Sequence, residues 1–187
     1  RSMALATQTS YNVPRENPGV RAYFRVSAIN SLGAGAANVT SIQVPYLKAS
    51  APQNVVIVDS GTSVVATYGA PASLGGSATV SYYSQTSKDG GTTWSGIAVG
   101  SQLTLTGSRP AKGTSQLYRV IAYTAYGYSD ASAAVTITSA ATAPGASYVS
   151  SFVLNADKSM TLTWRVSTDN GGSPITATVL YTSTDGT

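Results

Sequence analysis

The chain has 187 residues, a formal net charge of +4 and only 10% charged residues, well below the roughly 25% that is usual for a globular domain. It contains neither cysteine nor histidine, which excludes disulfides, thiolate nucleophiles, Cys/His zinc sites and Ser-His-Asp triads. Glu16 is the single glutamate, so little remains for acid–base catalysis. We expect no enzyme activity, no cofactor and no metal site.

The basic residues are scattered along the chain and never form a run, whereas nucleic-acid-binding proteins gather them on one face or in one arm. We therefore expect no nucleic-acid partner. No stretch approaches the roughly 18 consecutive apolar residues of a membrane span, and no signal-peptide pattern follows Arg1, so we interpret the chain as processed or excised. Low charge and the lack of thiols favour an extracellular place, on a cell or virion surface.

Short apolar segments follow one another along the chain, rich in Val, Ile, Thr and Tyr, with turn residues between them. In chain order the clearest are residues 24–30, 63–68, 118–124 and 159–164. The last shows the alternation best, because Met160, Leu162 and Trp164 are separated by threonines. A period of two is typical of a half-buried strand. The predicted fold class is therefore all-β.

The segments repeat. Residues 63–77 return as residues 159–173 with an offset of 164 − 68 = 96, and residues 24–33 return as residues 118–127 with an offset of 119 − 25 = 94. A period near 95 residues is the size of a domain and too long for one solenoid unit. The sequence therefore predicts domains in tandem.

These repeats resemble a known family. Tyr68-Gly-Ala-Pro followed by Gly75-Gly76-Ser77 is similar to strand B and the B–C loop of fibronectin type III domains, and Trp164 followed by Gly171-Gly172-Ser173 repeats it. Residues 24–33 and 118–127 look like strand F and the F–G turn of the same family. The resemblance covers nearly the whole chain and points to a tandem array of the kind found on bacterial or phage surfaces.

The family resemblance implies a fold of immunoglobulin-like β-sandwiches in tandem, one complete and two partial. It places the core positions at Tyr68, Val120, Trp164, Phe24 and Val26. The family's tyrosine before strand F is replaced by Ala22 and Gln116 in the two copies. We therefore expect the tyrosine-corner hydrogen bond to be absent or supplied by another residue. A buried Tyr68 hydroxyl would need a partner of its own.

Proline-ended segments of small residues mark the domain boundaries, at residues 48–52 and 140–144. We predict a complete domain over residues 48–141. Residues 1–47 would then hold only the C-terminal half of a domain, strands E, F and G. Residues 142–187 would hold only the N-terminal half, strands A, B and C and the start of C′.

The two predicted halves are complementary in length, with 46 and 47 residues against 94 for the complete domain. Three explanations are open. The chain is a piece of a longer array; or neighbouring copies complete one another head to tail, which would propagate a filament; or the two ends close on each other. The last is disfavoured, because linkers of about five residues span only about 17 Å.

Residues 87–94 fit the Asp-box pattern of tight hairpins, with Ser87, Asp89, Gly91 and Trp94 at its fixed positions. In sialidases the box repeats around a propeller beside an arginine cluster and a Tyr/Glu pair, which this chain lacks. We interpret the motif as a structural C–C′ turn, in which glycine supplies positive φ.

The predicted F–G region carries three tyrosines, Tyr123, Tyr126 and Tyr128. Tyrosine provides stiff, amphipathic contact area, so these residues are the candidate contact surface and could stack on surface glycans. The competing interpretation is that they pack on the linker and the neighbouring domain. Arg119 should serve as a cross-strand partner. Asn38 begins a glycosylation sequon, which matters only in a host that glycosylates.

Together these features predict a non-catalytic structural or adhesive extracellular repeat protein. Its partners would be neighbouring copies or domains of the same array. The alternative is a ligand- or glycan-binding module of a phage tail or fibre, or of a secreted polysaccharide-degrading enzyme. Fold-level analogy carries both, since this fold hosts many unrelated roles.

Overall fold

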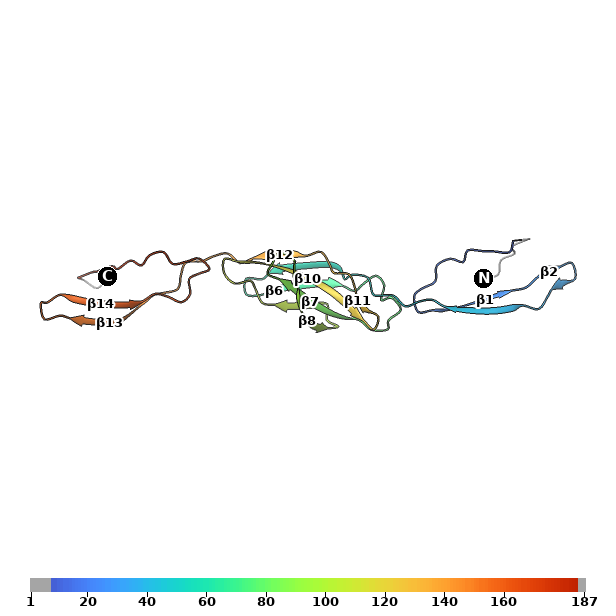
Figure 1. The fold of residues 1–187 in the computed structure, drawn as a ribbon, viewed down its shortest axis with the longest axis horizontal. Helices are drawn as coiled ribbons and strands as arrows, with labels where there is room; N and C mark the ends of the chain where they lie inside the picture. The colour runs from blue at the N-terminus through green and yellow to red at the C-terminus, as the bar shows by residue number, and fades with distance from the viewer. Residues whose placement is uncertain (1–7, 185–187) are drawn as a thin grey trace.

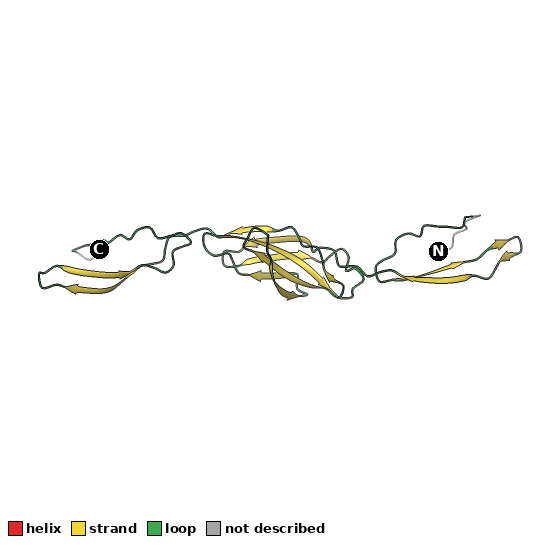
Figure 2. Ribbon diagram, viewed as in Figure 1, coloured by secondary structure: helices red, strands yellow, loops and turns green. Residues whose placement is uncertain are grey.

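The computed structural model describes residues 8–184, and within that range the regular structure is entirely β-strand. Figure 1 shows three units in a row along the longest axis, with the two flanking units at opposite ends of the central one. Figure 2 shows that only loops connect the strands. The chain is therefore an extended string of β units.

The first sheet of the central unit has three antiparallel strands. They are β5 (Gln53–Asp59), β6 (Val64–Gly69) and β9 (Thr104–Gly107), in the order β5-β6-β9. Strand β6 pairs on both sides, with Val65 opposite Val58 on β5 and Thr106 on β9. This sheet corresponds to strands A, B and E.

The second sheet of the central unit has five strands. They are β7 (Ser81–Ser87), β8 (Ser95–Gly100), β10 (Ser115–Thr124), β11 (Gly127–Tyr128) and β12 (Val135–Thr138). The order is β11-β10-β7-β8, with β12 also on β10, and all pairs are antiparallel. A three-stranded A-B-E sheet opposite C′-C-F-G is the fibronectin type III arrangement of an immunoglobulin-like sandwich.

The core lies between these two sheets, and the alternation of β10 shows how the sequence builds it. Tyr118, Val120 and Ala122 are 4%, 1% and 0% exposed, whereas Tyr123 on the opposite face is 39% exposed. Successive side chains of a strand point to opposite faces, so every second residue enters the core. The full cluster is Ala49, Ile57, Val64, Ala66, Tyr68, Tyr82, Leu105, Tyr118, Val120, Ala122 and Ile137.

Two core tyrosines place their hydroxyls on backbone carbonyls. Tyr68 donates to Gln102 O at 2.8 Å, and Tyr118 donates to Ser108 O at 2.8 Å. The second bond ties strand F to the E–F corner, so Tyr118 supplies the link that the replaced corner tyrosine would have made. Burial raises the pKa of Tyr68 to about 12, with a smaller contribution from Tyr82.

The flanking units are single hairpins. In the N-terminal unit β1 (Arg21–Val26) pairs with β4 (Asn38–Gln43), and the tip is formed by β2 (Ile29–Asn30) and β3 (Gly33–Ala34). The C-terminal unit consists of β13 (Tyr148–Leu154) and β14 (Met160–Arg165), paired with a register shift after Val149.

The flanking core positions differ from the expectation. Val26 is 74% exposed and Trp164 is 41% exposed, while Phe24 is half-buried. The reason is that, within residues 8–184, no second sheet faces either hairpin. In addition, residues 174–184 and the described residues 8–20 form no strand, although the sequence predicts strands C and E there in full or in part. A strand without a sheet partner has no ladder of hydrogen bonds to hold it. Residues 1–7 and 185–187, parts of the predicted halves, lie outside the described range.

Candidate functional site

The Asp-box motif forms the turn between β7 and β8. The Ser87 hydroxyl donates to Asp89 Oδ1 at 2.7 Å and accepts from the Gly91 amide at 2.9 Å. The Thr93 amide donates to the same carboxylate at 2.9 Å, and Trp94 Nε1 donates to Gly91 O at 2.9 Å. Every polar group of the motif is thus directed at its own turn.

The electrostatics of this turn agree with a structural role. Hydrogen bonds from the Thr93 side chain and amide, and then from Ser87, hold the pKa of Asp89 far below its usual range. The carboxylate is therefore ionised at neutral pH, and a permanently ionised group held by its own turn is poorly suited to proton transfer. The geometry indicates that the motif stabilises the β7–β8 hairpin.

Arg119 lies on the outer face of the second sheet. Its Nε donates to Gln85 Oε1 at 2.8 Å, and its guanidinium carbon lies 3.7 Å from the centre of a Trp94 ring. Arg119 and Gln85 are direct partners in the β10–β7 register. The structure thus makes Arg119 a cross-strand partner of Gln85. The cation–π contact with Trp94 links it to the Asp-box turn.

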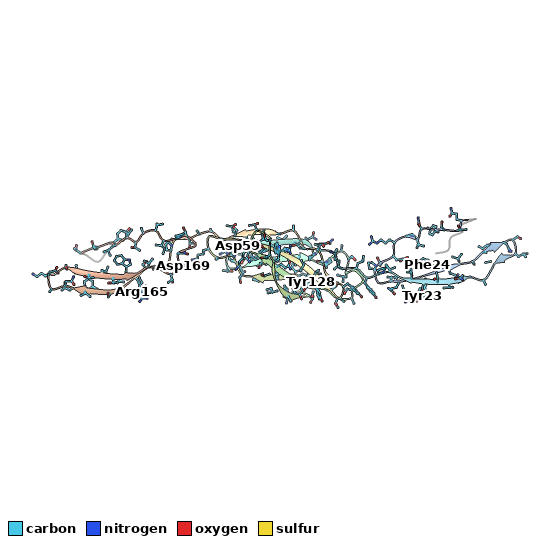
Figure 3. The ribbon with its side chains drawn as sticks, in the orientation of Figure 1. Tyr23, Phe24, Asp59, Tyr128, Arg165 and Asp169 are labelled. Atoms are coloured by element: carbon cyan, nitrogen blue, oxygen red, sulfur yellow. The ribbon has the colours of Figure 1, made fainter. Side chains whose placement is uncertain are left out.

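Three tyrosines cluster beside it on the same outer face. The ring centroids of Tyr123 and Tyr128 are 4.7 Å apart, and Tyr83 lies 5.3 Å from Tyr128 and 6.0 Å from Tyr123. A side-chain hydrogen bond with Tyr83 is the first cause that raises the pKa of Tyr128, followed by burial. Figure 3 marks Tyr128 on the central unit. Its ring is 51% exposed, so the cluster is open to solvent.

Tyr126, the third predicted contact residue, is placed elsewhere. Its ring stacks on Tyr46 of the preceding linker, with centroids 4.3 Å apart and planes at 17°. Burial, and then a hydrogen bond with Tyr46, raise the pKa of Tyr126. The structure therefore separates the three predicted tyrosines: Tyr123 and Tyr128 share the outer face, where Tyr83 joins them, and Tyr126 belongs to a contact between units.

For Tyr126 this contact between units agrees with the competing interpretation of the sequence, in which the tyrosines pack on the linker and the neighbouring domain. The main-chain contacts around it are not predicted by the sequence. Around the first linker the Leu47 amide donates to Gly75 O and the Ser50 amide donates to Ser73 O, both at 2.9 Å. Lys48 reaches Asp130 at 2.6 Å, although both side chains are largely exposed. The B–C loop of the central unit thus receives the chain that comes from the N-terminal unit.

The second linker repeats the arrangement. The Thr142 amide donates to Gly171 O and the Gly145 amide donates to Asp169 O, both at 2.8 Å. Lys112 of the central unit reaches Asp169 at 2.8 Å, and Figure 3 marks Asp169 near the central end of the C-terminal unit. The Gly-Gly pair, found in both B–C loops, was the available sequence signal. In the sequence this pair indicates only the family resemblance, and its contact with the linker is seen in the structure.

Other kinds of site receive no support within residues 8–184. No three acidic residues gather there as a metal would require, and no helix there is long and apolar enough to cross a membrane. Asn38 begins β4 and is exposed, so its sequon is accessible.

Comparisons with known proteins agree on the fold. No protein-family model and no curated protein sequence matches the chain. Among solved structures, domains d3–d4 of the rat CD45 extracellular region superpose with a TM-score of 0.53 at 13% identity, over 73% of this chain and 75% of that one. This similarity shows a shared β-sandwich fold.

Two weaker similarities have TM-scores below one half. Titin domains A168–A170 give 0.45 at 24% identity, over 63% of this chain and 40% of that one. The twitchin kinase region of C. elegans gives 0.44 at 18% identity, over 61% and 19%.

Proposed function

We propose that this chain is a non-catalytic segment of a structural array, a spacer of β-sandwich units outside a cell or on a virion. The observation that carries the proposal is that the same two backbone hydrogen bonds recur at both linkers, in a chain whose three units lie in a row (Figure 1). A polypeptide built this way gains reach with each added unit. Its lack of histidine and cysteine and its self-satisfied turn motif support a mechanical role over a chemical one.

Light scattering coupled to size-exclusion chromatography, followed by negative-stain imaging of the full chain, tests this proposal. We expect an elongated particle that elutes earlier than a sphere of its mass. A compact particle would contradict the spacer role, because its units would have to fold back on one another.

A second part of the proposal concerns the open faces of the flanking units, which we infer are completed head to tail by a second copy of the chain. Three exposed apolar positions have buried equivalents in the central unit: Val26 with Val120, Met160 with Val64, and Trp164 with Tyr68. One flanking unit carries strands of the A–B half and the other carries strands of the F–G half. Joined, they would reproduce the central sandwich.

The test is the molar mass of the chain as a function of concentration. We expect polymers that grow with concentration, and Val26→Asp should abolish them because a charge cannot be buried unpaired in the completed core. The matched control is Ile97→Asp, which changes a side chain that is 67% exposed on the completed central unit. A native chain that stays monomeric at every concentration would contradict completion by a second copy and leave the spacer role standing.

The glycan-binding alternative rests on the cluster of Tyr83, Tyr123 and Tyr128, which presents aromatic rings beside the polar Gln85 and Arg119. Such a surface could stack on the apolar faces of sugars. A glycan array probed with the full chain tests it. Saturable binding that is lost in Tyr123→Ala/Tyr128→Ala would favour this role, and retained binding in that variant would exclude the cluster as the site.

A further inference from the structure

We propose that the double-glycine B–C loop is a docking surface for the preceding unit, and that it fixes the angle between consecutive units. The occupant is the E–F turn of that unit together with its linker. We name the two contacts joint 1 (residues 17–20, 44–50 and 73–77) and joint 2 (residues 111–114, 139–145 and 169–173). This inference rests on the proposed spacer function, to which it adds a fixed geometry.

The two joints share their main-chain hydrogen bonds, one for one. The pairs in joint 1 are Gly19 N to Val44 O (3.2 Å), Val44 N to Val20 O (2.9 Å), Leu47 N to Gly75 O (2.9 Å) and Ser50 N to Ser73 O (2.9 Å). Their counterparts in joint 2 are Gly113 N to Ser139 O (2.8 Å), Ser139 N to Thr114 O (2.9 Å), Thr142 N to Gly171 O (2.8 Å) and Gly145 N to Asp169 O (2.8 Å). Bonds that recur at the repeat distance are a property of the unit and not of one linker.

The glycines of the loop have the same conformation in both copies. Gly75 and Gly76 have φ of +66° and +90°, and Gly171 and Gly172 have φ of +67° and +86°. Such φ values are favourable for glycine and costly for residues with a Cβ. The B–C turn therefore has the same conformation in both copies of the repeat.

Space, as well as conformation, demands glycine here. A Cβ on Gly76 would lie 2.7 Å from Pro18 O, and one on Gly172 would overlap Lys112 O, the equivalent atom in joint 2. On the opposite side of joint 2, a Cβ on Gly113 would overlap Gly172 O. The B–C loop thus meets the E–F turn of the preceding unit backbone to backbone. In joint 2 only a turn with glycine at its tip can approach this closely.

The first experiment compares two glycines of the central unit that have nearly the same φ and different surroundings. Gly76 has φ +90° and contacts the preceding unit, whereas Gly61 has φ +91° and nothing within 4 Å of a Cβ. Alanine at either position has to adopt a similar positive φ, but only at Gly76 would its Cβ contact the preceding unit. Because the chain has no cysteine, Arg25→Cys and Lys88→Cys can carry spin labels on either side of joint 1. Double electron–electron resonance then gives the distribution of distances between them.

We expect a narrow distribution in the otherwise native chain and in Gly61→Ala, and a broader, shifted one in Gly76→Ala. The thermal midpoints of the two alanine variants should fall alike. A native distribution that is already broad, or an equal response to both variants, would overturn the fixed joint. Elongation in the light-scattering test would survive that result, so failure of the joint and failure of the spacer role can be told apart.

A second pair of variants examines joint 2 from the E–F side. Gly113 has φ +73° and lies against Gly172, and Gly100 has φ +75° with nothing within 4 Å of a Cβ. Labels at Lys88→Cys and Ser151→Cys span this joint. Gly113→Ala should broaden the distribution across joint 2 and leave joint 1 unchanged, and Gly100→Ala should change neither. Broadening of joint 1 by Gly113→Ala would instead indicate loss of the central fold and overturn the assignment.

Discussion

One tyrosine hydroxyl, that of Tyr118, links the core of the central unit to its E–F corner. Tyr118 and Phe24 occupy equivalent positions on strand F, and the difference between them is the hydroxyl that donates to Ser108 O at 2.8 Å. In the central unit that bond closes the E–F corner beneath joint 2. In the N-terminal unit Phe24 cannot make it, so the two units reach the same turn with different support.

Tyr118→Phe should lower the free energy of unfolding of the central unit by about 1 kcal/mol, because one partly buried hydrogen bond is lost and the ring remains. Chemical denaturation monitored by tyrosine and tryptophan fluorescence measures it. Tyr148→Phe is the control, since this side chain is 58% exposed on a flanking hairpin. An unchanged midpoint in Tyr118→Phe would show that water replaces the bond at no cost.

Asp89 makes the central unit sensitive to acid. Its folded-state pKa is lowered below the ordinary value of 3.8 by Thr93 and Ser87. The stabilisation is therefore complete above the unfolded-state pKa and is lost as the pH falls toward the folded-state pKa. In Asp89→Asn the thermal midpoint should fall at neutral pH and decline less between there and about pH 2. Parallel pH profiles for the two proteins would contradict this role.

At the scale of elements, the sequence correctly predicts the strands that pair with neighbours in the two sheets of the central unit. The alternation of residues 118–124 and 63–68 corresponds to the buried faces of β10 and β6. The failures are instructive: residues 174–184 carry apolar residues, including Leu180, which is 57% exposed, and form no strand. Hydrophobic periodicity predicts which face of a segment would be buried in a strand. Formation of the strand also requires a neighbouring strand with which its backbone can form hydrogen bonds.

Amide exchange reports brief local openings, and the flanking hairpins should open far more often than their central equivalents while staying formed most of the time. Strands β13 and β14 repeat the pairing of β5 and β6, but no second sheet of the described part of the chain covers them. An isolated hairpin is marginal in water. At low concentration, amide hydrogen exchange followed by NMR should be slow in β5 and β6 and fast in β13 and β14. Equal protection of both hairpins would mean that the C-terminal unit folds without a second layer.

At the scale of the whole molecule, the arrangement of units depends on contacts between residues far apart in the chain, which local sequence patterns do not predict. The sequence offers packing on the linker and the neighbouring domain as one interpretation of the candidate tyrosines. It does not identify Tyr46 as the partner of Tyr126, because the two residues are 80 positions apart (126 − 46) and meet only at the boundary between units. The same holds for Lys48 and Asp130. That exposed ion pair contributes little by itself, so the stacked rings are the main side-chain difference between the joints.

Joint 2 has Ala141 where joint 1 has Tyr46, by the repeat offset of 95. Tyr46→Ala should therefore give joint 1 the mobility of joint 2, while the shared backbone bonds persist. The distance distribution across joint 1 should broaden only to the width seen across joint 2.

The raised pKa of Tyr126 provides an independent measurement of the same change. Removing Tyr46 takes away ring coverage and a hydrogen-bond partner, so the pKa of Tyr126 should fall toward its ordinary value, as followed by NMR of ¹³C-labelled tyrosine. Tyr23→Ala is the control, because that ring is 70% exposed on the N-terminal hairpin. If the pKa of Tyr126 falls while the distance distribution across joint 1 does not broaden, the contact of the B–C loop glycines alone holds the joint. If neither changes, the two rings do not stack in solution.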